Sequence, residues 1–280
     1  MDREFEDFKF QLQIFDFITT DIFSAGRELI EDVLGYPIGH PSHLTRFLLD
    51  RQISRQAKTI VSGRGPDECL AGYAWHTSEY ADTKKHLQRL TVTDNDLLKR
   101  LFRQELNTFL ERRVQYSRIF WQPGITLTLR QRLQYDLLSL FEAWNIIEGT
   151  LACALGVYIS NPFLEPGLMK ALLSLPDRFR IRNNEQKWFL RETFKNQYPS
   201  YLLNNPKRAL TLDVQSYLTD LSFDNLMKIL YYDSVFTQKY LTQEGCEYLV
   251  RNTLEDTRNL GWQIWSIYLC SVAYDLLDCS

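Results

Sequence analysis

The fold is decided by residues 58–76, KTIVSGRGPDECLAGYAWH. Residues 59–61 have the β-branched composition typical of a strand, and we expect the strand to stop at the Ser-Gly pair that follows. A turn with two glycines then leads to the acidic pair Asp67 and Glu68. Glycine lets backbone approach a ligand, and open α/β sheets bind ligands at the carboxyl ends of their strands, so this turn is a candidate binding loop. The alternative is a plain strand-to-helix turn in which Asp67 caps the helix.

Upstream of this stretch, the sequence predicts a strand, two helices and a strand, in that order. Residues 8–15, FKFQLQIF, alternate apolar and polar side chains, which predicts a half-buried strand. Residues 21–34 have apolar side chains at helical spacing, and a second helix is expected to begin at Pro41 and to lead to the strand at residues 59–61. This order predicts an α/β layer over residues 1–80.

Residues 81–280 are predicted to be mainly helical and to form one continuous domain with that layer. Helical spacing covers residues 82–113, 127–155 with a break near Gly149, 168–175, 185–197, and a series that runs to residue 277. In the last helix, Trp262 and Trp265 are expected to be buried against the helix that contains Leu137 and Phe141. The predicted fold class is α/β, a parallel sheet followed by a large helical C-terminal half.

The composition argues against several classes of function. A formal net charge of −3 gives no basic surface for a nucleic acid. No apolar run approaches the roughly 18 residues that span a membrane, and the charged N-terminus is unlike a signal peptide. The five cysteines are scattered without C-x-x-C pairs, as is typical of reduced thiols in a cytoplasmic protein without a zinc site. We therefore expect a cytoplasmic protein without nucleic-acid or membrane partners.

Four segments in order resemble motifs of the asparagine synthetase family. Residues 62–73, SGRGPDECLAGY, resemble its S-G-E/Q-G-x-D-E-x-x-x-G-Y motif, and residues 37–42, PIGHPS, resemble the segment one helix upstream. Residues 161–165, NPFLE, are similar to its R-x-P-F-L-D segment, and residues 185–192, EQKWFLRE, to its K-x-x-L-R-E helix. The order and spacing agree over most of the chain, so the chain is identified as a member of this family.

The resemblance implies a fold, a reaction and a set of site residues. The fold would be a partial adenine-nucleotide-hydrolase-like parallel sheet, and the reaction would be ATP-dependent adenylation of a carboxylate, followed by attack of an amine to form an amide. ATP and Mg²⁺ would be the cofactors, since magnesium prefers hard oxygen ligands. By their positions in the motifs, the matched residues are Ser62, Gly63, Arg64, Gly65, Asp67 and Glu68 for the nucleotide, Asp67 and Glu68 for the metal, and Lys187 and Glu148 for catalysis. The alternative for Lys187 is an ordinary exposed helical lysine.

The sequence also departs from the family pattern at three places. The S-G-G-x-D-S loop, whose backbone amides cradle phosphates in the family, does not occur in these residues. Arg64 replaces a Glu or Gln, and a guanidinium cannot accept the hydrogen bonds that those side chains accept. Tyr158 and Ser160 replace a Glu and an Arg, so Glu148 is the one acidic residue that remains in this part of the pattern.

These departures leave the function open between two hypotheses. One is a divergent, N-terminally short synthetase domain that is inactive alone and needs a partner chain for the missing loop; the other is a non-catalytic binding or scaffold module. A fragment or a split gene product is a third possibility. In the sheet of the resembled fold, two strands stand between the strands that residues 8–15 and 59–61 resemble, and neither of these two strands is found here. We therefore expect unpaired strand edges. The strands would either pair differently from the family, or the sheet would be completed by a partner or by self-association. We expect Phe10, Leu12, Ile14, Ile60 and Val61 to be the least protected core residues.

Overall fold

The computed structural model describes residues 21–77, 95–103, 126–200, 203, 210 and 212–278. The predicted strand at residues 8–15, and with it Phe10, Leu12 and Ile14, lies outside the described residues, as does most of the predicted helical stretch 82–113. The helices of the first half are α1 (Ile22–Glu28), η2 (Leu29–Leu34), α2 (Pro41–Ser54), α3 (Pro66–Cys69), η3 (Ala74–His76), α5 (Asn95–Leu101), α7 (Leu129–Ser139) and η5 (Leu140–Trp144). Those of the second half are α8 (Asn145–Leu155), η6 (Pro162–Leu164), α9 (Pro166–Ser174), η7 (Asp177–Phe179), α10 (Trp188–Phe194), α12 (Val214–Thr219), α13 (Phe223–Met227), η8 (Lys228–Tyr232), α14 (Val235–Tyr240), α15 (Gln243–Leu254) and α16 (Gly261–Asp278).

A small parallel sheet is formed by β1 (Thr59–Val61) and β2 (Tyr158–Ser160). The β1 strand is the one expected from its β-branched residues, whereas β2 was not predicted. Ile60 is buried on one face of the sheet, and on the other face Val61 and Tyr158 are 71% and 67% exposed. The described residues are thus mainly helical with a small parallel sheet, which agrees with the predicted α/β class.

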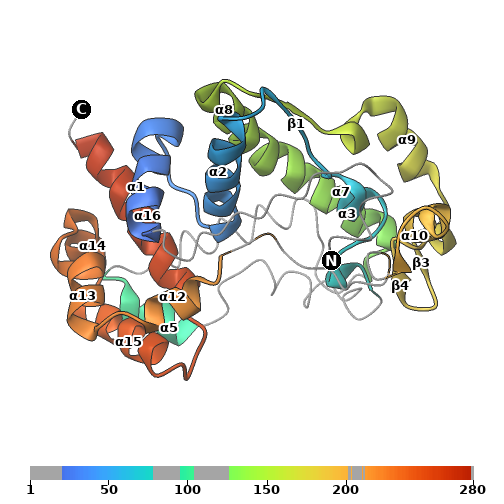
Figure 1. Ribbon diagram of the computed structural model, residues 1–280. Coiled ribbons are helices and arrows are strands. Elements are labelled where there is room, and N and C mark those ends of the chain that lie inside the picture. The colour runs from blue at the N-terminus through green and yellow to red at the C-terminus, as the bar shows by residue number, and fades with distance from the viewer. Residues whose placement is uncertain are drawn as a thin grey trace.

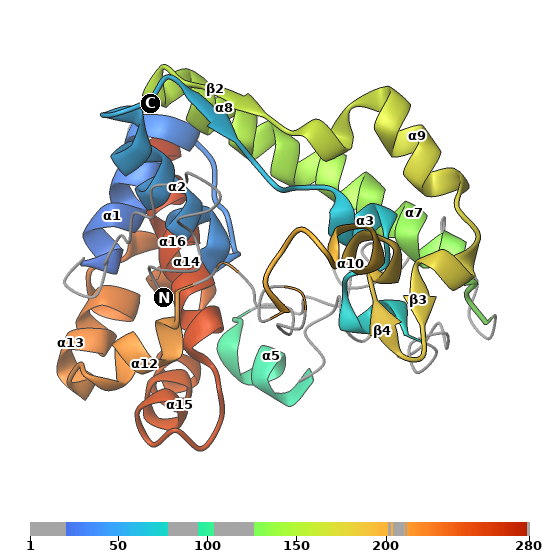
Figure 2. The same cartoon turned by 45° about the vertical axis from the view of Figure 1, so that its right-hand side comes forward.

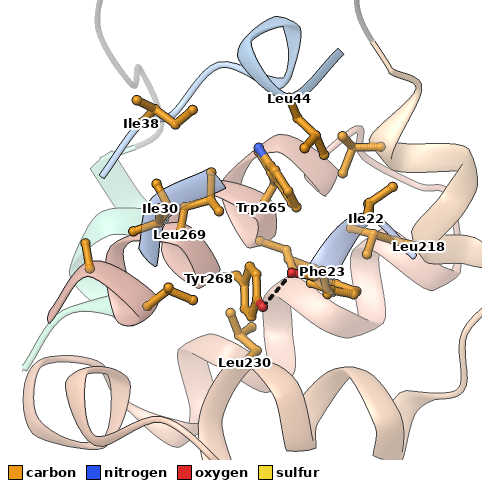
Figure 3. Packing of buried hydrophobic residues seen from close by; sticks show 14 of the residues in the cluster. Ile22, Phe23, Ile30, Ile38, Leu44, Leu218, Leu230, Trp265, Tyr268 and Leu269 are labelled. Atoms are coloured by element: carbon orange, nitrogen blue, oxygen red, sulfur yellow. Dashed lines mark hydrogen bonds between the residues drawn. The ribbon is translucent and has the colours of Figure 1, made fainter. Parts of the chain in front are cut away.

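Most helices gather around one apolar cluster, and we call this part the helical region: α1, η2, α2, α5, α8, α12, α13, η8, α14, α15 and α16. Its centre is Trp265 of α16, which is completely buried among side chains from α1, η2 and α12 (Figure 3). Tyr268 lies beside it and donates a 2.8 Å hydrogen bond to the carbonyl of Phe23. Helical spacing predicted these helices because they bury one continuous apolar face.

The smaller part, which we call the anchored region, consists of α3, η3, α7, α9, η7, β3, β4 and α10. Figures 1 and 2 show it apart from the helical region, with β1 and the continuous α7–η5–α8 helix running between the two. The long helix is interrupted by a π-helical segment, η5. The break that was expected near Gly149 does not occur, because Gly149 lies inside α8. Gly149 is exposed, and a Cβ added there would meet nothing within 4 Å, so this glycine imposes no bend.

Two further sequence predictions are corrected. Residues 185–186 do not begin a helix: they form β4 (Glu185–Gln186), which pairs antiparallel with β3 (Ile181–Arg182), and α10 begins only at Trp188. Trp262 is not buried but 47% exposed, and the cluster around Trp265 is separate from the one that contains Leu137. Phe141, the other expected contact, is exposed. No helix in the described part of the chain is both long and apolar enough to cross a membrane.

Candidate functional site

The loop after β1 lies where the carboxyl ends of both parallel strands meet. The backbone N–H of Ser62 donates to the carbonyl of Ser160 at 2.8 Å, which extends the strand ladder by one residue. Gly65 then takes a φ of 104°, which disfavours side chains, and an added Cβ would lie 2.7 Å from the Leu164 side chain. The loop is therefore held in one conformation against the segment that follows β2, at the edge where α/β sheets bind ligands.

Asp67 and Lys187 come together at this site. Asp67 lies in the first turn of α3, not in the loop itself, and its Oδ1 is 2.6 Å from the Lys187 Nζ. Lys187 has a left-handed backbone conformation, with φ of 54°, and its N–H donates to the Leu70 carbonyl at 3.2 Å. Both side chains are partly exposed, so the pair can be reached from solvent.

Gly72 makes room for this pair. A Cβ added at Gly72 would lie 1.8 Å from the Asp67 Oδ1 and 2.2 Å from the Lys187 Cε. Neither distance is sterically possible, so any other residue would push the two side chains apart. The Gly-Tyr of the sequence motif thus has a direct structural reason for its glycine.

Glu68 points to a different partner from its neighbour Asp67. Its carboxylate is buried and accepts a 2.6 Å hydrogen bond from the Tyr73 hydroxyl. Burial raises the pKa of Glu68, and burial together with the nearby Glu68 charge raises the pKa of Tyr73. The Tyr73 ring stacks on Trp75, with 4.4 Å between ring centroids. One of the two carboxylate oxygens of Glu68 is therefore engaged by Tyr73.

Glu148 is the centre of a second, more deeply buried cluster. Its Oε1 lies 2.7 Å from the Arg64 Nε and 3.2 Å from an Nη of Arg46. The Asn161 amide nitrogen lies 3.3 Å from its other oxygen. The residue expected to act in catalysis is therefore neutralised by two guanidinium groups in this conformation.

Arg46 connects this cluster to α2 and to the β1 loop. Its Nε donates to the completely buried Asp50 at 2.6 Å, and its Nη1 is 3.4 Å from the Ser62 hydroxyl. Burial raises the pKa of Asp50, although the ion pair with Arg46 opposes the shift. The sequence analysis missed Arg46 and Asp50 as site residues, although their spacing of four on a helix is typical of an ion pair.

An aromatic group covers one side of Arg64. The guanidinium carbon lies 5.0 Å from the centroid of the Trp144 ring. The His43 ring lies 4.1 Å from the same tryptophan, and burial, together with nearby His40 and Arg64, lowers the pKa of His43 to about 4. Burial also lowers the pKa of Arg64, although Glu148 opposes the shift. The sequence analysis did not identify His43 or Trp144, because only tertiary contacts bring them beside Arg64.

The other expected positions are placed as follows. The backbone of Gly63 is exposed, whereas Ser62 is buried with its hydroxyl near Arg46. Tyr158 is directed to solvent on the open face of the sheet, so it does not take the place of a buried carboxylate. Among the described residues, no group of three or more His, Cys, Asp or Glu side chains could hold a metal ion by itself.

The carboxylate of Asp67 fits a magnesium ion that is held mainly by phosphates and water. Mg²⁺ usually binds one or two carboxylates and keeps the rest of its ligands from substrate and solvent. Asp67 supplies one partly exposed carboxylate, and the Lys187 ammonium beside it supplies a positive charge for a phosphate. This donor set would therefore fit a metal that is shared with phosphates, and not a metal cage built from protein ligands alone.

Comparison with known protein families gives one match. Residues 4–276 match the family model described as asparagine synthase. The comparison with curated proteins found no match.

Proposed function

The chain belongs to the asparagine synthase family, and from this premise we propose that it takes part in ATP-dependent formation of an amide bond. The observation that carries the proposal is the Asp67–Lys187 pair, held at the carboxyl ends of two parallel strands with Gly72 making room for it. Both residues match motif positions of the family. The adenine-nucleotide-hydrolase-like sheet, of which β1 and β2 would be a part, belongs to the same proposal.

The chain's own residues would bind and orient the reactants. ATP would supply the group that activates a carboxylate, and Mg²⁺ would neutralise its phosphates. Asp67 would hold the metal, and Lys187 would stabilise negative charge that develops on the reacting phosphate or acyl group. The backbone of residues 62–65, including Gly63 and Gly65, would face the nucleotide.

A partner completes the proposal. The S-G-G-x-D-S loop does not occur in these 280 residues, so we propose that a separate polypeptide supplies this phosphate cradle. The open face of the sheet at Val61 and Tyr158 supports an interaction there. Among the described residues, Cys69, Cys153, Cys246 and Cys270 are free thiols, which supports the cytoplasmic location that we propose.

The test is ATP–pyrophosphate exchange across a panel of amino acids and other carboxylates. We expect no exchange by the isolated chain, and exchange when a polypeptide carrying S-G-G-x-D-S is added. Asp67→Asn and Lys187→Met should each lower that exchange about 100-fold or more, as expected for groups that stabilise transition-state charge. Lys170→Met, at an exposed position of α9, is the matched control and should leave the rate unchanged. Exchange that is indifferent to Asp67→Asn would refute the proposal.

The alternative is a non-catalytic binding module. The observation that favours it is the pairing of Glu148 with two guanidinium groups, which leaves this carboxylate without a free role as a base. In that case ATP and Mg²⁺ would bind with or without the added loop, and exchange would never appear. Equilibrium dialysis of radiolabelled ATP, run beside the exchange assay, separates the two functions.

A further inference from the structure

Arg64 is held rigidly, and its hydrogen-bonding capacity is only partly used. Its Nε lies 2.7 Å from the Oε1 of the buried Glu148 in an ion pair, and its planar head lies over the Trp144 ring. These two contacts come from α8 and η5, while the fixed β1 loop carries the Arg64 backbone. A long side chain that is held from three elements has already lost most of its rotamer freedom, so a ligand would not have to immobilise it.

The two terminal nitrogens of Arg64 have no acceptor among the described residues. A guanidinium has five N–H donors, and the contact with Glu148 is made by the Nε. The side chain is 19% exposed, so part of it can be reached from solvent. The buried Nη2 of Arg46, the other arginine that contacts Glu148, also has no hydrogen-bond partner. The cluster therefore has unused donors on both arginines.

Stability alone does not account for this arrangement. The desolvation penalty of burying an arginine and a glutamate often exceeds the attraction between them. Apolar residues of similar volume often stabilise a protein better. Asp50 and Glu148 carry two negative charges against the two positive charges of Arg46 and Arg64, so the cluster is balanced before any ligand arrives. Ionisable groups that are desolvated and paired in this way are candidates for a functional site.

We infer that Arg64 is the receptor for a planar or tetrahedral oxyanion, with Glu148 as the residue that positions it. A guanidinium with both terminal nitrogens available pairs with carboxylate or phosphate through two parallel hydrogen bonds. Arg64 is three residues before Asp67, so the oxyanion would lie close to the Asp67–Lys187 pair. The inference rests on the proposed function for the identity of the oxyanion, which is either a phosphate of the nucleotide or the carboxylate of the acyl substrate.

The direct test is protection of Arg64 from phenylglyoxal, a reagent for guanidinium groups, followed by peptide mass spectrometry of the whole chain. Arg182 is the internal control, because its guanidinium also lies over a tryptophan, Trp188 at 4.7 Å, but is exposed. We expect an oxyanion to slow modification of Arg64 about tenfold and to leave Arg182 unaffected, in line with a charge-assisted pair. Pyrophosphate and succinate are the two probes. Protection by pyrophosphate alone identifies a phosphate, and protection by succinate identifies a carboxylate.

Two variants separate binding from positioning. Arg64→Gln should weaken binding of the protecting anion about tenfold in a calorimetric titration, whereas Arg182→Gln should not. Glu148→Gln should weaken binding of the anion. It should also make Arg64 of the variant react faster with phenylglyoxal, because the Arg64 guanidinium would no longer be fixed by the Glu148 carboxylate. A purely structural Glu148 would change the melting temperature without this change in reactivity.

The inference is overturned when neither probe protects Arg64, or when Arg182 is protected equally. The labelling is done on the unaltered chain, so it is decisive even where a variant does not fold. It also requires no turnover. Protection of Arg64 without exchange in the presence of the added S-G-G-x-D-S polypeptide would therefore refute the proposed function alone, and exchange without protection would refute the role of Arg64 alone.

Discussion

Among the described residues, 31 buried apolar side chains form one cluster in the helical region, whereas the cluster of the anchored region contains four, Cys69, Leu70, Leu137 and Leu172. The anchored region compensates with buried polar contacts. Arg180 donates to the carbonyls of Cys69, Leu172 and Leu173 at 3.1, 3.2 and 2.7 Å. Apolar packing therefore supports one half of this protein, while the half that carries Asp67 and Lys187 depends on a few charged side chains.

A second polar contact fastens the same region. Asp136 of α7 accepts hydrogen bonds from the Trp75 indole at 2.6 Å and from the His76 ring at 2.7 Å. Arg132, one turn away, donates to the carbonyls of Trp75 and Thr77. The segment after α3 is thus tied to α7 by side chains that water would otherwise solvate, and the loss of one partner leaves several groups unpaired.

The largest effect is expected at the centre of the helical region. Trp265→Ala should lower the free energy of unfolding by about 3–5 kcal/mol, because it removes a completely buried indole and leaves a cavity. Urea unfolding followed by circular dichroism measures it. Trp262→Ala is the matched control: it removes a 47% exposed side chain and its 2.5 Å hydrogen bond to the Gly39 carbonyl, and should cost about 1 kcal/mol. Equal decreases in the free energy of unfolding for the two variants would mean that packing around Trp265 is not the main source of stability in the helical region.

In the anchored region, Arg180→Ala should destabilise the protein by about 3 kcal/mol, since several backbone carbonyls would lose their donor in a buried place. Arg178→Ala, two residues earlier and exposed, should change stability by less than about 0.5 kcal/mol. Hydrogen exchange should also show faster exchange in α9 and α3 than in α16. A uniform change over both regions would argue against their separate support.

The boundary between the two regions should respond to acid through His43. Burial lowers its pKa from 6.5 to about 4 in the folded chain, so its contribution to stability is fully present above pH 6.5 and is lost as the pH falls towards 4. The groups that face it are His40 and Arg64. As the pH falls from 6.5 to 4, the free energy of unfolding of the His43→Phe variant should therefore decrease by about 3 kcal/mol less than that of the unaltered chain. Urea midpoints at the two pH values measure this, and parallel losses in both proteins would contradict it.

The smallest of these effects is expected at Gly72. Gly72→Ala should destabilise the protein by about 1–3 kcal/mol, because the new methyl group overlaps Asp67 and Lys187. It should also make Lys187 more reactive towards acetic anhydride, since the ion pair must open. Gly63→Ala, in the neighbouring loop with nothing within 4 Å of the added Cβ, should do neither. Unchanged reactivity of Lys187 would mean that the pair does not depend on this glycine.

Local patterning was sufficient to predict the helices of the helical region and the β1 strand. Apolar side chains at helical spacing predicted helices over residues 21–34 and from Pro41, and the structure has α1, η2 and α2 there. Local patterning is sufficient in such places because each helix reports its own buried face. The resemblance assigned Asp67 and Lys187 to one set of site residues, and the structure brings the two side chains together in a 2.6 Å ion pair.

The interaction partners of the charged residues depend on tertiary contacts, and local sequence patterns do not predict them. Nothing in the local pattern shows that Arg64 pairs with Glu148, that Glu68 binds Tyr73, or that Arg180 supports α3. The β2 strand and the β3–β4 pair were missed for the same reason, since strands of two or three residues are too short to display a period. Periodicity records how much of a residue is buried, whereas a hydrogen bond depends on which distant atom meets it, and only the folded chain brings those atoms together.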